Sequence, residues 1–89
     1  MRILKYEIPI IDNFYIMMPF GSSILSCQAQ KDIPVIWVLA HETLEEVKRH
    51  FILVGTGQEI EEKYQHANFI GTVQQHYFVW HLFEIFNEH

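Results

Sequence analysis

Alternation of apolar and polar residues predicts two short strands at the start of the chain. Residues 2–8 alternate with a period of two, as a half-buried strand requires, and Pro9 limits that run. Residues 13–20 predict a second strand that stops near Pro19, and the turn-forming residues 19–23 follow it. We therefore expect two strands separated by chain breaks.

The next run, residues 23–30, alternates again. Leu25, Cys27 and Ala29 are expected to form its apolar side, and its polar side is expected to face water. Residues 31–34 break the chain. Residues 35–40 then form a continuous apolar run rich in β-branched residues, which predicts a central strand covered on both faces.

The middle of the chain is less regular. Residues 41–49 fit either a helical turn or an exposed loop, and we expect a loop or a single turn that leads into a strand over 47–55. Residues 56–67 contain glycine punctuation followed by acidic residues, which predicts a short helix of one or two turns.

The C-terminal segment predicts a hairpin whose second strand is apolar on both sides. Residues 68–74 form the first strand, the chain turns near 75–77, and residues 77–86 run back. One side of the returning strand carries Tyr77, Val79, His81, Phe83 and Ile85, and the other carries Phe78, Trp80, Leu82, Glu84 and Phe86. One side can face the core, so the other needs a packed helix, the second half of a barrel, or a neighbouring subunit.

Together these runs predict a mainly β protein. We expect a small antiparallel open barrel or sandwich of six to seven short strands with one short helical turn. A chain of 89 residues predicts a single domain over 1–89. So short a chain buries a modest share of its surface, and aromatic residues, at 15 % of the sequence, are expected to supply much of the core.

Composition narrows the function classes. Six Lys and Arg against eleven Asp and Glu give a net charge of −5, which disfavours non-specific nucleic-acid binding. The single cysteine excludes an intramolecular disulfide, and no secretory signal pattern follows Met1. The longest apolar run is far shorter than the ~20 residues of a membrane helix. We therefore expect an intracellular protein that does not enter a membrane.

The histidines do not predict a metal site, although the chain has six of them. His76 and His81 are five apart, so on a strand they point to opposite faces. His41, His50 and His66 fall in three different segments. We therefore expect no metal, and we expect His81 to be partly buried with a hydrogen-bond partner.

Two further features have a functional and a structural interpretation. The turn at residues 54–58 could hold an anion on its backbone N–H groups, but it lacks a phosphate-binding motif and acidic residues follow it, which favours a plain turn. Cys27 is expected to be an inert core residue rather than a nucleophile.

Glu84 interrupts an aromatic strand. A cross-strand pair with Lys5 or Arg49 is the first interpretation of this carboxylate, and a ligand contact is the second.

Six sequence blocks resemble a family of short, uncharacterised proteins from phages, prophages and some bacteria. The blocks are KYEIPI, ILSCQAQ, PVIWVLA, VGTG, FIGTVQ and FVWHLFEI, and they run from Lys5 to Ile85. The family brings no catalytic residues to this chain. The positions that match its pattern, without a known role, are Gly55, Gly57, Gly71, Trp80, His81 and Glu84.

The resemblance implies a small non-catalytic protein in the cytoplasm of a bacterial host. Such a protein would antagonise antiviral defence by sequestering a nucleotide signal or by blocking a defence protein, without a cofactor and as a homo-oligomer. The expected ligand contacts are the aromatic residues Trp37, Trp80 and His81 and the cations Lys48 and Arg49. The alternatives are an acidic DNA mimic, a virion or regulatory accessory protein, and a small hydrolase that uses histidines.

Overall fold

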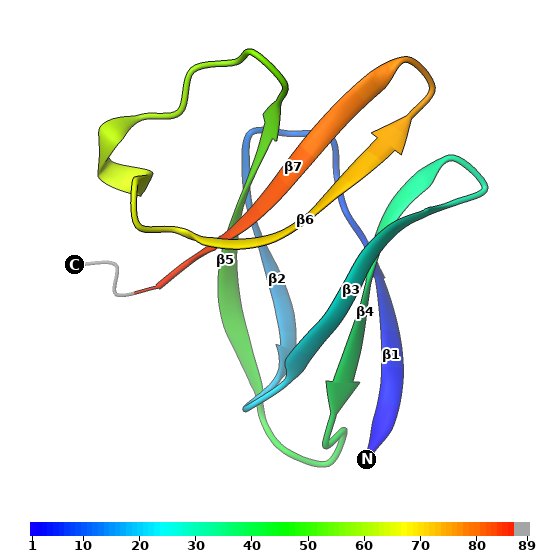
Figure 1. Ribbon diagram of the computed structural model, residues 1–89. Helices are drawn as coiled ribbons and strands as arrows, with labels where there is room; N and C mark the ends of the chain where they lie inside the picture. Colours follow the sequence, from blue (N-terminus) through cyan, green and yellow to red (C-terminus); the bar gives the residue numbers. More distant parts are fainter. Residues whose placement is uncertain (87–89) are drawn as a thin grey trace.

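The computed structural model describes residues 1–86, and its regular secondary structure is almost entirely β-strand (Figure 1). The seven strands are β1 (Arg2–Glu7), β2 (Asn13–Pro19), β3 (Ser23–Gln30), β4 (Ile33–Ala40), β5 (Glu46–Gly55), β6 (Asn68–Gln75) and β7 (Phe78–Ile85). A single 3-10 turn, η1 (Glu62–Tyr64), lies between β5 and β6. The predicted mainly β class and strand count are therefore confirmed. No helix among the described residues is long and apolar enough to span a membrane.

The strands form two antiparallel sheets. One has the order β1-β4-β3 and the other has the order β2-β5-β7-β6. Strands β3 and β6, at the edges of different sheets, approach each other closely without joining into one sheet (Figure 1). The result is a small sandwich whose two inner faces enclose one core, and the two sheets do not close into a barrel.

Side chains from both sheets fill that core. The buried residues of the cluster are Ile8, Phe14, Met18, Ile36, Val38, Ala40, Phe51, Leu53 and Leu82. Central strand β4 contributes every second residue from Ile36 to Ala40, as its period of two requires. On its opposite side Trp37 and Leu39 are half-buried, so the expectation that both faces are covered holds fully for one face only.

A β-bulge in β3 changes which of its side chains face the core. The pairing with β4 shifts between Ile24 and Ser26, which leaves Leu25 as the extra residue. Ile24 and Cys27 therefore pack on the core, whereas Leu25 is 51 % exposed and Ala29 is exposed. The predicted apolar side is therefore wrong for Leu25, because the bulge interrupts the alternation, whereas Ala29 keeps the side of Cys27 and is exposed near the end of the strand.

The segment between β5 and β6 contains the one short helical turn that the sequence predicts. Its only helical turn is η1, which has no buried residue. The hydroxyl of Tyr64 accepts a hydrogen bond from the Asn13 side-chain amide on β2, at 3.0 Å, and this contact ties the segment to the second sheet. Residues 41–45 form the expected loop and turn before β5.

Contacts between two hairpin tips join the sheets at one end. The β3–β4 turn contains Lys31 and Asp32, and the β6–β7 turn contains His76, all with positive φ. The Asp32 carboxylate accepts a hydrogen bond from the backbone N–H of His76 at 3.0 Å, and its other oxygen lies 2.5 Å from the His76 Nε2. These contacts hold the β6–β7 tip against the other sheet.

The approach of β3 to β6 requires a glycine at position 71. A Cβ placed on Gly71 would lie 2.9 Å from the Cβ of Cys27, which is closer than carbon atoms pack. Cys27 Cβ is attached directly to the β3 backbone and cannot swing away. Any side chain at position 71 therefore has to push the two sheets apart.

We predict that Gly71→Ala lowers the free energy of unfolding by about 1–3 kcal/mol through overpacking. Urea denaturation measures this loss. In a Cys27→Gly background, which removes the clashing Cβ, the same substitution should cost clearly less. Equal costs in the two backgrounds would show that the β3–β6 contact is not the reason for the glycine.

Candidate functional site

The five predicted contact residues do not converge on one place. Trp37 lies on the outer face of the three-stranded sheet, where the Lys5 Nζ is 5.9 Å from the ring centroid. Lys48 lies on the outer face of the other sheet, with its Nζ 4.4 Å from the centroid of the Tyr15 ring. Trp37 is in a different sheet from the other four residues. Lys48 directly precedes Arg49 on β5, and both line a hollow of about 530 Å³ beside Phe20 and Phe86.

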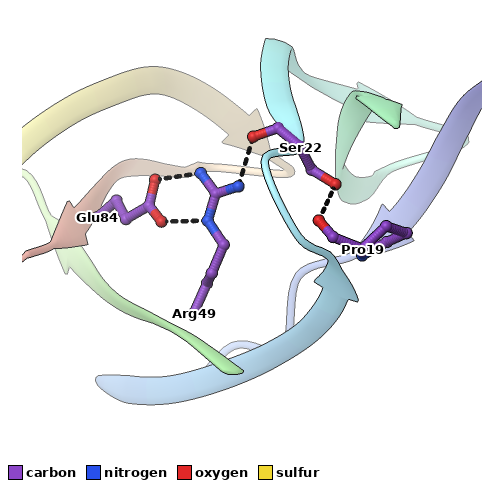
Figure 2. Close-up of polar contacts among 4 residues, drawn as sticks. All are labelled: Pro19, Ser22, Arg49 and Glu84. Carbon is purple, nitrogen blue, oxygen red and sulfur yellow. Dashed lines mark hydrogen bonds and ion pairs between the residues drawn. The ribbon is translucent and has the colours of Figure 1, made fainter. Parts of the chain in front are cut away.

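Arg49 is engaged in a charge pair inside the molecule. Its Nε and Nη2 donate to the two carboxylate oxygens of Glu84 on β7, at 2.5 and 2.8 Å, and its Nη1 donates to the backbone carbonyl oxygen of Ser22 at 2.5 Å (Figure 2). The Glu84 side chain is 3 % exposed. The predicted cross-strand pair is confirmed with Arg49 as the partner.

The surroundings of this pair indicate a structural role. The Ser22 hydroxyl donates to the carbonyl oxygen of Pro19 at 2.5 Å, so the turn between β2 and β3 is fixed where the guanidinium meets it (Figure 2). The bidentate geometry is the strong form of such a pair and neutralises the arginine charge. Arg49 therefore links three segments of the chain, and this use competes with the predicted contact to a ligand anion.

Trp80 and His81 lie near the opposite end of the second sheet. The Trp80 ring stacks on Phe78, with centroids 5.7 Å apart and planes at 22°, and its Nε1 donates to the Gln75 side chain at 3.2 Å. Because successive strand residues alternate, His81 points to the other face of β7. The two residues share an end of the sheet but not a surface.

His81 has the hydrogen-bond partners that its partial burial demands. Its Nε2 lies 2.8 Å from the Thr56 Oγ1, and its Nδ1 lies 3.0 Å from the Thr72 Oγ1. A threonine hydroxyl can donate or accept, so a neutral imidazole is satisfied on both nitrogens. The pair of threonines connects the turn after β5 with β6 through β7.

The glycine-containing turn after β5 uses its amides within the protein. Gly55 N–H donates to the Gln58 side-chain oxygen at 2.9 Å, and Gln58 N–H donates back to the Gly55 carbonyl at 3.0 Å. Thr56 N–H donates to the Val79 carbonyl at 3.2 Å. Gly57 has a φ of +86°, which a tight turn needs and glycine adopts freely. This arrangement favours a plain turn over an anion site.

A groove runs between this turn and the tip of the β6–β7 hairpin. Its volume is about 390 Å³, and the residues that line it are Gly55, Thr56, Gln58, Tyr77, Phe78, Val79 and Trp80. We call it the aromatic groove. Tyr77 is 99 % exposed and Phe78 is 59 % exposed, whereas Trp80, on which Phe78 stacks, is half-buried. None of the lining side chains carries a charge.

Sequence reasoning found Trp80 but missed Tyr77 and Phe78 as candidate contacts. The alternation places both on the faces of a strand. A usable signal was present, because two consecutive aromatic residues directly after a turn cannot both point into a core. Residues 55–58, at the end of β5, reach the hairpin tip through a long-range tertiary contact. No local sequence pattern indicates this contact.

Two observations concern the metal-ligating and thiol side chains of residues 1–86. No group of three or more His, Cys, Asp and Glu side chains in this range could hold a metal ion. Burial raises the pKa of the Cys27 thiol from 9.0 to about 11. A neutral thiol is a poor nucleophile, so the interpretation of Cys27 as a packing residue is favoured.

Comparison with known proteins identifies one family. A family model described as a domain of unknown function (DUF7352) matches residues 1–89. No curated protein and no solved structure matches the chain.

Alkylation should report the raised pKa of Cys27. At pH 8 we expect iodoacetamide to modify the native protein about 100-fold more slowly than the urea-unfolded chain. The reason is that a thiol pKa of about 11 instead of 9.0 lowers the thiolate fraction by that factor. The folded state keeps a proton that the unfolded state loses, so the free energy of unfolding should fall as pH rises from 9 to 11. Native and unfolded chains that react equally fast at pH 8 would contradict this environment.

Removal of one partner of the buried Arg49–Glu84 pair should lower the free energy of unfolding strongly. Arg49→Met leaves the Glu84 carboxylate buried without its counter-charge, which typically costs about 3–5 kcal/mol of unfolding free energy. The double variant Arg49→Met/Glu84→Leu should recover much of that loss. Arg2→Met, which breaks an exposed pair with Glu42, is the matched control and should cost at most about 1 kcal/mol. Similar losses for Arg49→Met and Arg2→Met in urea denaturation would rule out the structural role.

Proposed function

This chain belongs to the DUF7352 family of unknown function, and we propose that it is a small non-catalytic protein that binds a partner through the aromatic groove. The observation that carries the proposal is the exposure of Tyr77 and Phe78 at the tip of a hairpin, in one groove with Trp80. Aromatic side chains in such positions are the usual anchors of protein interfaces, because each buries a large area with few rotatable bonds.

The tip is also held in place before any partner arrives. Phe78 stacks on Trp80, the Trp80 indole is hydrogen-bonded to Gln75, and His76 is held by Asp32 of the other sheet. Side chains that are already ordered lose less entropy on binding. The arrangement therefore supports binding by a fixed surface.

The groove favours a protein as the partner over a nucleotide signal. The rings could stack on a base, but the lining residues offer no cation to a phosphate. Arg49 lies six residues before Gly55 on β5, about 20 Å away at strand spacing, and it is already paired with Glu84. We therefore favour the blocking of a defence protein over the sequestering of a nucleotide.

The setting that we propose is a bacterium infected by a phage. The sequence blocks resemble proteins of phages and prophages, and small phage proteins without catalytic groups commonly act by covering a surface of a host protein. In this proposal the protein works in the host cytoplasm and occludes a component of antiviral defence.

We also propose that the protein is a homo-oligomer that uses the outer face of the second sheet. Phe69 on β6 is 55 % exposed and packs edge-on against the half-buried Phe83 of β7, with centroids 5.4 Å apart. This face is the second apolar side of β7. A partner copy would remove these rings from water.

Native mass spectrometry and size-exclusion chromatography test the oligomer. We expect the unmodified chain to elute as a dimer or larger assembly and Phe69→Lys to elute as a monomer, because a charge in the interface is left unpaired. Leu25→Lys, on the outer face of the other sheet, is the control and should remain assembled. A monomer at micromolar concentration without any substitution would refute this part of the proposal.

A plating assay tests the function. We expect the chain, expressed in host strains that each carry one defence system, to restore plating of a sensitive phage on at least one strain. Tyr77→Ala/Phe78→Ala should abolish the effect, since loss of an aromatic anchor typically weakens an interface by about 2 kcal/mol, roughly 30-fold.

Leu25→Ala serves as the control, because Leu25 is exposed on the other sheet, and this variant should act like the unmodified protein. Full activity of the Tyr77→Ala/Phe78→Ala variant would show that the groove is not the binding site. Failure of the unmodified chain on every strain would contradict an anti-defence role.

A further inference from the structure

We infer that the aromatic groove receives a segment of a partner protein in which an aromatic side chain lies two residues from a lysine or arginine. This inference rests on the proposed function, because it names the partner of the same groove. It comes from a second hollow that adjoins the groove and differs from it in charge.

The second hollow lies on the other side of Gln58. Its volume is about 120 Å³, and Gln58 lines both hollows. The residues that line it are Asp12, Asn13, Ile52, Leu53, Val54, Gln58, Glu59, Ile60, Glu61 and Tyr64. Three of these side chains are carboxylates, and none is a lysine or arginine. We call it the acidic hollow.

The acidic hollow complements a cation. Glu59 and Glu61 are exposed and meet Asp12 there, so their fields add over a small volume. Lys63 lies 3.4 Å from Glu61 and offsets part of that charge, but both side chains are well exposed and the pair is screened by solvent. The net charge of −5 on the whole chain further favours a basic partner over an acidic one.

The two hollows adjoin each other at Gln58, so their occupants have to be neighbouring side chains. Gln58 is held by the hydrogen bond from Gly55 N–H, so this shared wall has a defined position. In an extended segment, residues i and i+2 point to the same side and are about 7 Å apart. An occupant with an aromatic residue at i and a basic residue at i+2 can therefore place one side chain in each hollow.

The same charges disfavour a nucleotide in this position. A base could stack on Tyr77 or Phe78, but its phosphates would then lie near Glu59 and Glu61 rather than near a cation. Protein segments with neighbouring aromatic and basic side chains meet both requirements.

A titration of the full chain followed by NMR tests the inference with defined probes. The main probe is the peptide acetyl-Trp-Ala-Lys-amide, and the comparison probes are acetyl-Trp-Ala-Glu-amide, acetyl-Ala-Ala-Lys-amide and AMP. The signals followed are the Trp80 indole N–H and the Gln58 side-chain amide, one inside the groove and one on the shared wall. We expect the Trp-Ala-Lys peptide to shift both signals and to bind at least about fivefold more tightly than each comparison probe.

Substitutions separate the two hollows. Glu59→Gln/Glu61→Gln should weaken the Trp-Ala-Lys peptide about tenfold in low salt and leave the Trp-Ala-Glu peptide no weaker. Glu42→Gln/Glu45→Gln removes the same charge from the loop before β5 and is the matched control, which should change the affinity little. Phe78→Ala should weaken both tryptophan peptides.

The outcomes distinguish this inference from the proposal on which it rests. Equal affinity for the Lys and Glu peptides, tighter binding of AMP, or no shift of either signal by any probe would overturn the inference. If phage plating still depends on Tyr77 and Phe78 in any of those cases, the aromatic groove remains the binding site and only its partner has been misidentified.

Discussion

The structure depends on the burial of two inner sheet faces against one another in a chain of 89 residues. Leu82 and Phe51 are fully buried between the sheets, and the edges β3 and β6 come so close that position 71 has no room for a Cβ. Hydrophobic burial of this kind is the main favourable term in folding. Because each strand has one side in the core, whatever the protein binds has to meet the outer faces, the loops or the hairpin tips.

The polar residues of the inner faces follow the same constraint. Glu84 occupies a core-facing position on β7, and it is tolerated there because Arg49 neutralises it with a bidentate pair and Ser22 accepts the remaining contact. A guanidinium that is already bonded to Glu84 on the neighbouring strand and to the turn between β2 and β3 has little capacity left for a ligand. The same fold leaves Tyr77 and Phe78 beyond the end of the core, where no buried face can take them, and this contrast separates the structural cluster from the aromatic groove.

Much of this architecture could be predicted from the sequence, and the misses have definite causes. The strands followed from alternation and from Pro and Gly breaks. A cross-strand partner for Glu84, either Lys5 or Arg49, followed from one carboxylate in an aromatic strand, and the structure shows that the partner is Arg49. Leu25 was misplaced because a bulge needs no change in composition. The groove was missed because Gly55 and Trp80 belong to different strands, and only the pairing of β5 with β7 brings them together. Local patterns predict secondary-structure elements well. A site formed by long-range strand pairing can be predicted only when the register of the paired strands is known.

Hydrogen exchange of the backbone amides tests most directly whether a rigid core presents the aromatic tip. The account predicts slow exchange through the centre of β5 and β7, around Phe51 and Leu82, and continued protection up to the Gln75–Phe78 pair that closes the hairpin. The segment 56–67 should exchange much faster. If the amides next to Gln75 and Phe78 exchange as fast as that segment, the tip is not held in place and the account of a preformed binding surface is wrong.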